Sequence, residues 1–131
     1  MYVTVKQKTA MTKKVNVRGL KRAITSDCVV KYYAPWCGYC KSMAPTFHEV
    51  SQTIEKDHPE VKVVRFNMDK HGDEVKSEQV GMSTFGVPVH EDVKGFPTVI
   101  LYKSDGSRSM YKGPREADAM VSTIKAFYQK S

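Results

Sequence analysis

Two cysteines, Cys37 and Cys40, are separated by two residues in this 131-residue chain. Thiol–disulfide exchange needs an attacking thiolate, a second thiol close enough to release the mixed disulfide, and access for a bulky substrate. Pro35 ends a strand-like run just before the pair, and a helical pattern follows the pair. Backbone N–H groups and the dipole at a helix start lower the pKa of a thiol placed there. The spacing therefore predicts that Cys37 is the nucleophile and that Cys40, one turn further in, is the resolving thiol.

A Cys-x-x-Cys pair also occurs as half of a zinc site, which requires two more ligands at suitable spacing. The third cysteine and the four histidines form no ligand pattern with the pair; these residues are Cys28, His48, His58, His71 and His90. We therefore expect no bound metal and no cofactor, and we interpret the histidines as surface residues. Cys28 is interpreted as a buried strand thiol, with a regulatory or intermolecular disulfide as the alternative.

Lysine and arginine outnumber aspartate and glutamate by 21 to 14, which gives a formal net charge of +7. We interpret this charge as a solvated basic surface; the alternative is an affinity for acidic partners, and nucleic acid is not favoured as a partner by charge alone. The sequence holds no apolar stretch long enough to span a membrane and no apolar signal-peptide run near its start. We therefore expect a cytoplasmic protein, with the endoplasmic reticulum lumen as the alternative if a leader is missing from the sequence.

Hydrophobic periodicity predicts the elements that must position the cysteines. A β-branched and aromatic run at residues 28–34 is typical of a central strand covered on both faces. The apolar stripe that follows the cysteines predicts a helix over about residues 38–56. Further strands are expected near residues 14–17, 61–68, 98–102 and 108–112, and further helices near residues 18–25, 73–79 and from 113 onwards.

The predicted order β-α-β-α-β-α-β-β-α is typical of an α/β fold, here a single domain over residues 15–131. Residues 1–14 lack periodicity and are expected to form a basic N-terminal arm that could be flexible. Residues 80–95 form a long, turn-rich stretch, and loops of this length are usually functional or mobile.

Three segments, in the right order, resemble a known family. The sequence YAPWCGYCK at residues 33–41, followed by MAP at 43–45, resembles the active-site segment of thioredoxins and, more closely, of the catalytic domains of protein disulfide isomerases. The sequence KGFPT at residues 94–98 is similar to the isomerase segment that ends in a cis-proline. The sequence YKGPREAD at residues 111–118 resembles their final turn and helix. The resemblance covers the chain from about residue 28 to its end.

This resemblance implies a thioredoxin fold, in which helices flank a central mixed sheet on both faces. It also implies that Pro97 is cis, packs against the cysteine pair and offers backbone groups to a substrate strand. Gly38 would let a substrate chain approach closely, and Trp36 would form an apolar shelf beside the nucleophile. The residues expected to bind substrate are Trp36, Gly38, Tyr39, Phe96 and Pro97.

The sequence departs from the family at two charged positions. Lys31 stands where the family usually has a buried acid that accepts the proton of the resolving thiol. A desolvated Lys31 could take that proton when neutral or, when charged, stabilise the thiolate; the alternative is that it extends into solvent and contributes nothing. Arg65 replaces a family lysine, so two cations would face each other. We therefore expect an anion from the 80–95 loop, Glu91 or Asp92, to complete a proton relay there.

We expect a thiol–disulfide oxidoreductase that reduces, forms or isomerises disulfides in protein substrates through a mixed disulfide with Cys37. The alternative is a chaperone-like binding module that uses the Pro97 groove and has little or no redox activity. The implied partners are protein substrates with disulfides or thiols, and an electron donor or acceptor such as a thioredoxin reductase, glutathione or a thiol oxidase. Lys94 stands where isomerases often have a mobile arginine, so we expect a similar role for it.

Overall fold

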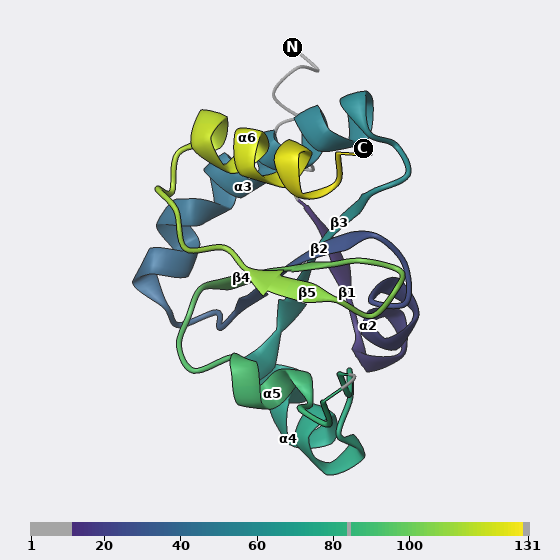
Figure 1. Cartoon of the computed structure of the whole chain (residues 1–131). Coiled ribbons are helices and arrows are strands. Elements are labelled where there is room, and N and C mark those ends of the chain that lie inside the picture. The colour runs from purple at the N-terminus through teal and green to yellow at the C-terminus, as the bar shows by residue number, and fades with distance from the viewer. Residues whose placement is uncertain (1–11, 84, 130–131) are drawn as a thin grey trace.

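A five-stranded sheet with the order β1-β3-β2-β4-β5 is the framework of the computed structural model (Figure 1), which describes residues 12–83 and 85–129. The strands are β1 Lys13–Val15, β2 Cys28–Tyr33, β3 Lys62–Asn67, β4 Thr98–Tyr102 and β5 Arg108–Met110. The helices are α2 Val17–Ala23, α3 Gly38–Asp57, α4 Met68–Glu78, α5 Val89–Asp92 and α6 Ala117–Phe127. Strands β1, β3 and β2 run parallel, whereas β4 is antiparallel to β2 and β5 is antiparallel to β4.

Strand β2 lies at the centre of the sheet, and its side chains alternate between two apolar layers. Val30 and Tyr32 pack in one layer with side chains of α2, α4 and α5. Val29 packs in the other layer with Phe47 of α3 and Ile124 of α6. Figure 1 shows α3 and α6 on one side of the sheet and α4 and α5 on the other. The expected mixed sheet with helices on both faces is therefore confirmed.

Helix α3 begins where the chain leaves β2, and it carries the predicted apolar stripe. The buried side chains of this stripe are Met43, Phe47, Val50 and Ile54. The helix continues through Pro45 as one element of 20 residues. Because the stripe packs onto the sheet, the N-terminus of α3 is fixed beside the end of the central strand.

Two helices differ from their predicted extents. Helix α4 begins at Met68, five residues before the expected start, because the Asn67 side chain caps it by accepting a hydrogen bond from the Lys70 N–H at 2.9 Å. The last helix begins at Ala117, later than the Gly113-Pro114 pair indicated. The 80–95 stretch contains a short helix, α5, that the sequence did not reveal.

A basic N-terminal arm was expected over residues 1–14. Its first eleven residues lie outside the described residues. Lys13 and Lys14 belong to β1 and pair in parallel with β3, so the sheet begins two residues before the expected domain boundary. Within the described part of the chain, no helix is both long and apolar enough to cross a membrane.

Replacing Ile124 by alanine is expected to lower the free energy of unfolding by about 2–4 kcal/mol, because the change leaves a cavity between α6, α3 and the sheet. Urea titration followed by circular dichroism measures this free energy. The matched control is Ser122→Ala on the exposed face of the same helix, which should change it by less than about 0.5 kcal/mol. Equal effects of the two substitutions would contradict the packing of α6.

Candidate active site

The cysteine pair lies at the junction of β2 and α3. Cys37 is the N-cap residue of α3, and its backbone N–H donates to the Ala34 carbonyl at 3.1 Å. The Cys37 Sγ atom accepts a hydrogen bond from the Cys40 backbone N–H at 3.2 Å. Cys37 and Cys40 are free thiols in this structure, and they are 7% and 4% exposed. The two sulfur-bearing residues thus lie on one face of the first helical turn, as the spacing predicted.

The electrostatics of the pair favour a thiolate at Cys37. The pKa of the Cys37 thiol is lowered by a hydrogen bond from the Cys40 side chain, by the backbone N–H groups of Cys40 and Tyr39, and by the charge of Arg115, with burial acting in the opposite direction. These groups supply partial or full positive charge at the sulfur, which stabilises the anion. Cys37 is therefore the thiol suited to nucleophilic attack.

The other two thiols stay protonated near neutral pH. Burial, and then the hydrogen bond to Cys37, raise the pKa of Cys40 to about 11, against a lowering effect of Lys31. Burial raises the pKa of the fully buried Cys28 to about 12. Among residues 12–83 and 85–129, no three His, Cys, Asp or Glu side chains gather as metal ligands. The geometry thus suits an attacking and a resolving thiol.

The segment before β4 meets the cysteine pair through Phe96, and the Phe96–Pro97 peptide bond is cis, as the resemblance implied. The Phe96 carbonyl accepts a hydrogen bond from the Cys37 thiol at 3.6 Å. Ala34, Cys37 and Cys40 form a small buried cluster, against which Phe96 packs. One site is therefore formed by two segments that are distant in sequence: the start of α3 and the residues just before β4.

Two aromatic side chains make the surface around the nucleophile apolar. Trp36 is 65% exposed and Tyr39 is 77% exposed. The Trp36 indole Nε1 donates to the Asp69 carboxylate at 3.0 Å, and its ring meets that of Phe96 edge-to-face at 5.9 Å. The space beside Gly38 is open, because a Cβ atom there would meet nothing within 4 Å. The five residues predicted to bind substrate therefore surround the cysteine pair.

Arg115 is a site residue that the sequence analysis missed. Its guanidinium Nη2 donates to the Pro97 carbonyl at 3.2 Å, and its charge lowers the pKa of Cys37. Lys94, for which a role like that of the isomerases' mobile arginine was expected, is exposed. The only signal in the sequence was a cation within the segment that resembles the family's final turn.

Lys31 is buried in the centre of β2, with only 3% of its surface exposed. Its Nζ atom lies 5.1 Å from the ring centre of Phe47 and 5.7 Å from that of Tyr33. Burial, and secondarily the charge of Arg65, lower the pKa of the Lys31 amine from 10.5 to about 8, against an opposing effect of Cys40. The alternative in which Lys31 extends into solvent is therefore wrong.

Arg65 is the register neighbour of Lys31 on β3, so the two expected cations do lie side by side. The Arg65 guanidinium is turned to other partners: it donates to the Thr12 carbonyl at 2.8 Å and to the Tyr33 hydroxyl at 3.2 Å. These bonds hold its charge next to Lys31.

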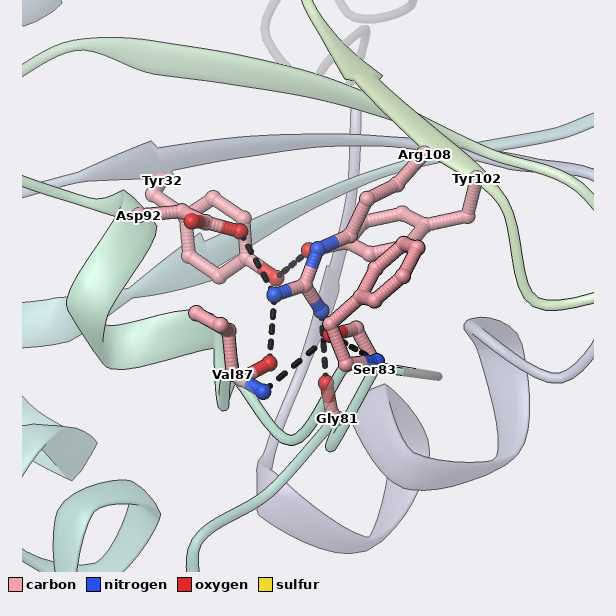
Figure 2. Close-up of polar contacts among 8 residues, drawn as sticks. Tyr32, Gly81, Ser83, Val87, Asp92, Tyr102 and Arg108 are labelled. Atoms are coloured by element: carbon pink, nitrogen blue, oxygen red, sulfur yellow. Dashed lines mark hydrogen bonds and ion pairs between the residues drawn. The ribbon is translucent and has the colours of Figure 1, made fainter.

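Glu91 and Asp92 do not complete this site, contrary to our expectation. Both belong to α5, which packs through Val89 on the sheet face opposite that of Lys31. Asp92 forms an ion pair with Arg108 at 2.8 Å (Figure 2), and Glu91 is exposed. The faces differ because alternate side chains of β2 point to opposite sides of the sheet.

Comparison with models of known families matches residues 3–126 to the family described as Thioredoxin. The chain belongs to the thioredoxin family. Among curated members, the protein disulfide-isomerase of Medicago sativa is 34% identical over 99 residues, which are 74% of this chain and 17% of that one. The protein disulfide-isomerase of Ricinus communis is 38% identical over 98 residues, which are 74% and 18%. This thioredoxin-family chain thus spans about a fifth of the length of the curated relatives it matches.

Solved thioredoxin-fold structures share the architecture at low identity. Human ERp44 form I superposes with a TM-score of 0.72 at 21% identity, covering 90% of this chain and 29% of that chain. The first two thioredoxin domains of Naumovozyma dairenensis Eps1p superpose with a TM-score of 0.69 at 19% identity, covering 86% and 39%. These matches establish the thioredoxin fold.

Replacing Arg115 by methionine is expected to raise the pKa of Cys37 and so to slow its alkylation by iodoacetamide at pH 7 several-fold, because the thiolate loses a nearby positive charge. Mass spectrometry of the alkylated peptide over a pH series gives both the rate and the pKa. Lys94→Met, which removes an exposed lysine, should leave both unchanged. An equal effect of the two variants would show that Arg115 has no specific role at the thiolate.

Proposed function

We propose that this thioredoxin-family chain is a thiol–disulfide oxidoreductase acting on protein substrates. The Cys37 thiolate attacks one sulfur of a substrate disulfide; the substrate S–S bond breaks, and one substrate sulfur leaves as a thiol after taking a proton. The Cys40 thiolate then attacks Cys37 Sγ and releases the second substrate thiol. The substrate gains two electrons, and the enzyme is left with a Cys37–Cys40 disulfide; the reverse sequence oxidises a dithiol.

The observation that carries this proposal is the opposite pKa shift of the two hydrogen-bonded thiols, lowered at Cys37 and raised to about 11 at Cys40. If the two thiols had equal pKa values, the structure would not indicate which of them attacks the substrate first. A low pKa at the outer thiol makes it both the nucleophile and the better leaving group, whereas the inner thiol reacts only after the mixed disulfide has formed.

Replacing Cys37 by serine is expected to abolish the acceleration of insulin reduction by dithiothreitol, because no mixed disulfide can form. Turbidity from the precipitating B chain measures this reaction. Cys28→Ala, at the buried thiol of β2, should retain it. Full retention of biological activity by the Cys37→Ser variant would instead support the chaperone-like binding module.

We further propose that Lys31 accepts the proton of Cys40 in the resolving step. The Lys31 amine is buried, is electrostatically coupled to Cys40 and has a pKa of about 8, so its neutral form is available near neutral pH. A neutral amine takes the thiol proton, and the resulting ammonium ion stabilises the thiolate. Arg65 is then a positioning residue, because its adjacent charge favours the neutral amine.

Replacing Lys31 by methionine is expected to slow resolution of the mixed disulfide about a hundredfold or more at pH 8, through loss of a general base. In the wild type the rate should rise with pH as Lys31 loses its proton near pH 8, whereas in the variant it should rise only towards the Cys40 pKa of about 11. Stopped-flow Trp36 fluorescence over a pH series measures the step. Lys41→Met, at an exposed lysine of α3, is the control. An unchanged pH profile in Lys31→Met would rule out the relay.

We infer that a glutathione couple, a thioredoxin reductase or a thiol oxidase recycles the pair. The compartment we propose is the endoplasmic reticulum lumen. The relatives named protein disulfide-isomerase fit this alternative, and the comparisons give no support to the cytoplasmic location expected from the sequence.

A further inference from the structure

Arg108 of the edge strand β5 holds a loop against the sheet (Figure 2). Its guanidinium donates to the carbonyl of Gly81 at 2.6 Å and to that of Val87, and it pairs with Asp92 at 2.8 Å. The Arg108 side chain is only 13% exposed. The loop residues 81–83 and 85–87 are therefore fixed relative to β5.

This fixed loop presents an aromatic side chain to solvent. The Ser83 N–H donates to the Val87 carbonyl at 3.0 Å, and the Ser83 hydroxyl oxygen accepts from the N–H groups of Phe85 and Val87 at 3.3 and 3.1 Å. Phe85 is nevertheless 92% exposed, and Met110 of β5, which lines the same hollow, is 39% exposed. An apolar patch on a hydrogen-bonded frame is typical of an interaction site.

Strand β5 also forms an edge of the sheet, and some of its backbone hydrogen-bonding groups point away from the sheet. It stands last in the strand order, so among the described residues no strand lies beyond it. The Tyr111 N–H donates to the Val99 carbonyl at 2.8 Å, so the backbone groups of Tyr111 face β4. Along an antiparallel strand, the backbone groups of successive residues point alternately towards the partner strand and away from it. The backbone N–H and C=O groups of Arg108 and Met110 therefore point outward, where an added strand could pair with them.

A groove runs along this edge towards the cysteine site. One hollow of about 560 Å³ is lined by Phe85, Val87, Ile100 and Met110 among others, and this volume lies within the range of about 300–1,000 Å³ of ligand pockets. A second hollow shares Val87 and Met110 and reaches Thr98, next to the cis-proline. We call the two hollows together the edge groove.

The register gives the length of chain that separates the edge groove from the cysteine site. Met110 pairs with Ile100, which lies three residues after Pro97 on the neighbouring strand. A chain added beyond β5 lies two strand spacings from β4, so three strand residues and two spacings separate it from Pro97, which is about 14 Å, or four to five residues of extended polypeptide. A substrate chain held at Pro97 thus reaches the edge groove within a few residues.

We propose that the edge groove binds the same substrate chain that reacts at Cys37, as an extended segment that adds to β5 and places apolar side chains against Phe85 and Met110. This inference rests on the proposed function, and it specifies the substrate class as unfolded polypeptide with apolar residues a few positions from its reactive cysteine. Continuity with the Pro97 segment favours a substrate over a second copy of this chain, since the hollow that contains Met110 also reaches Thr98, next to Pro97.

The first test compares a long and a short disulfide. The long probe is a peptide of about ten residues, in mixed disulfide with glutathione, with leucine and valine near its cysteine; the short probe is glutathione disulfide. In both assays dithiothreitol supplies the two electrons that return the Cys37–Cys40 disulfide to the dithiol after each turnover. Phe85→Ser is expected to raise KM for the long probe about tenfold with kcat unchanged, through loss of a buried aromatic contact, and to leave the short probe unaffected.

Met82→Ser is the matched control, because Met82 is 48% exposed on the same loop but lines a different hollow, on the Lys21 side of Arg108. It should leave both probes unchanged. An unchanged KM in Phe85→Ser, or equal changes in the two variants, overturns the proposal.

The second test asks where the bound chain lies. In Cys40→Ser the mixed disulfide with the long probe is trapped at Cys37, and hydrogen exchange of the Arg108 and Met110 amides should slow. No protection overturns strand addition at β5. Protection that appears without peptide, and grows with protein concentration, identifies a second copy as the occupant and also overturns the proposal.

Two further measurements distinguish a wrong proposal about the edge groove from a wrong proposal about the redox function. Turnover of glutathione disulfide by the wild type reports the redox chemistry alone. Binding of a cysteine-free form of the long peptide to Cys37→Ser/Cys40→Ser, followed by fluorescence anisotropy, reports the groove alone. Binding that is weakened by Phe85→Ser supports the groove, and binding indifferent to that substitution overturns it.

Discussion

The hydrogen bond from the Cys40 N–H to the Cys37 sulfur is the interaction on which the site depends. It exists because Cys37 occupies the N-cap position of α3, where backbone N–H groups lack helical partners. The apolar stripe of α3 fixes this helix end against the central strand, and the cis-proline segment closes over it from β4. The position of α3 therefore determines both the fold and the reactivity: its apolar side chains pack against the sheet, and its N-terminus stabilises a thiolate at Cys37.

The buried cation next to this centre has an energetic consequence. A pKa of about 8 for Lys31, against 10.5 for the free amine, means that folding disfavours its charged form by an amount of the order of 3 kcal/mol. The penalty is fully present below pH 8, where both folded and unfolded chains are protonated, and it disappears as the pH rises towards 10.5. The protein thus retains an energetically unfavourable cation close to Cys40, and groups with strongly shifted pKa values are common at functional sites.

Much of this site was accessible from the sequence, because its main parts are local. Cys37, Cys40 and the helix that carries them follow from one short pattern, and Pro97 followed from a resemblance over a few residues. Arg115 was missed because its contact with the Pro97 carbonyl depends on how the turn before α6 folds back over β4. The expectation for Asp92 was wrong because the sheet face on which a loop packs is decided by tertiary contacts, here Val89 and Arg108. The Asn67 cap likewise moved the start of α4 into a polar stretch without a periodic signal.

Cys28 gives the molecule a third thiol with a different character. It is fully buried in β2, and its pKa of about 12 leaves almost no thiolate in the folded state. A thiol reagent that alkylates Cys37 in the folded protein therefore reaches Cys28 only when the centre of the sheet opens, so the labelling rate of Cys28 reports this opening. Strand β2 thus begins at a buried thiol that reports the stability of the sheet and leads to the exposed end of α3, where the Cys37–Cys40 pair lies.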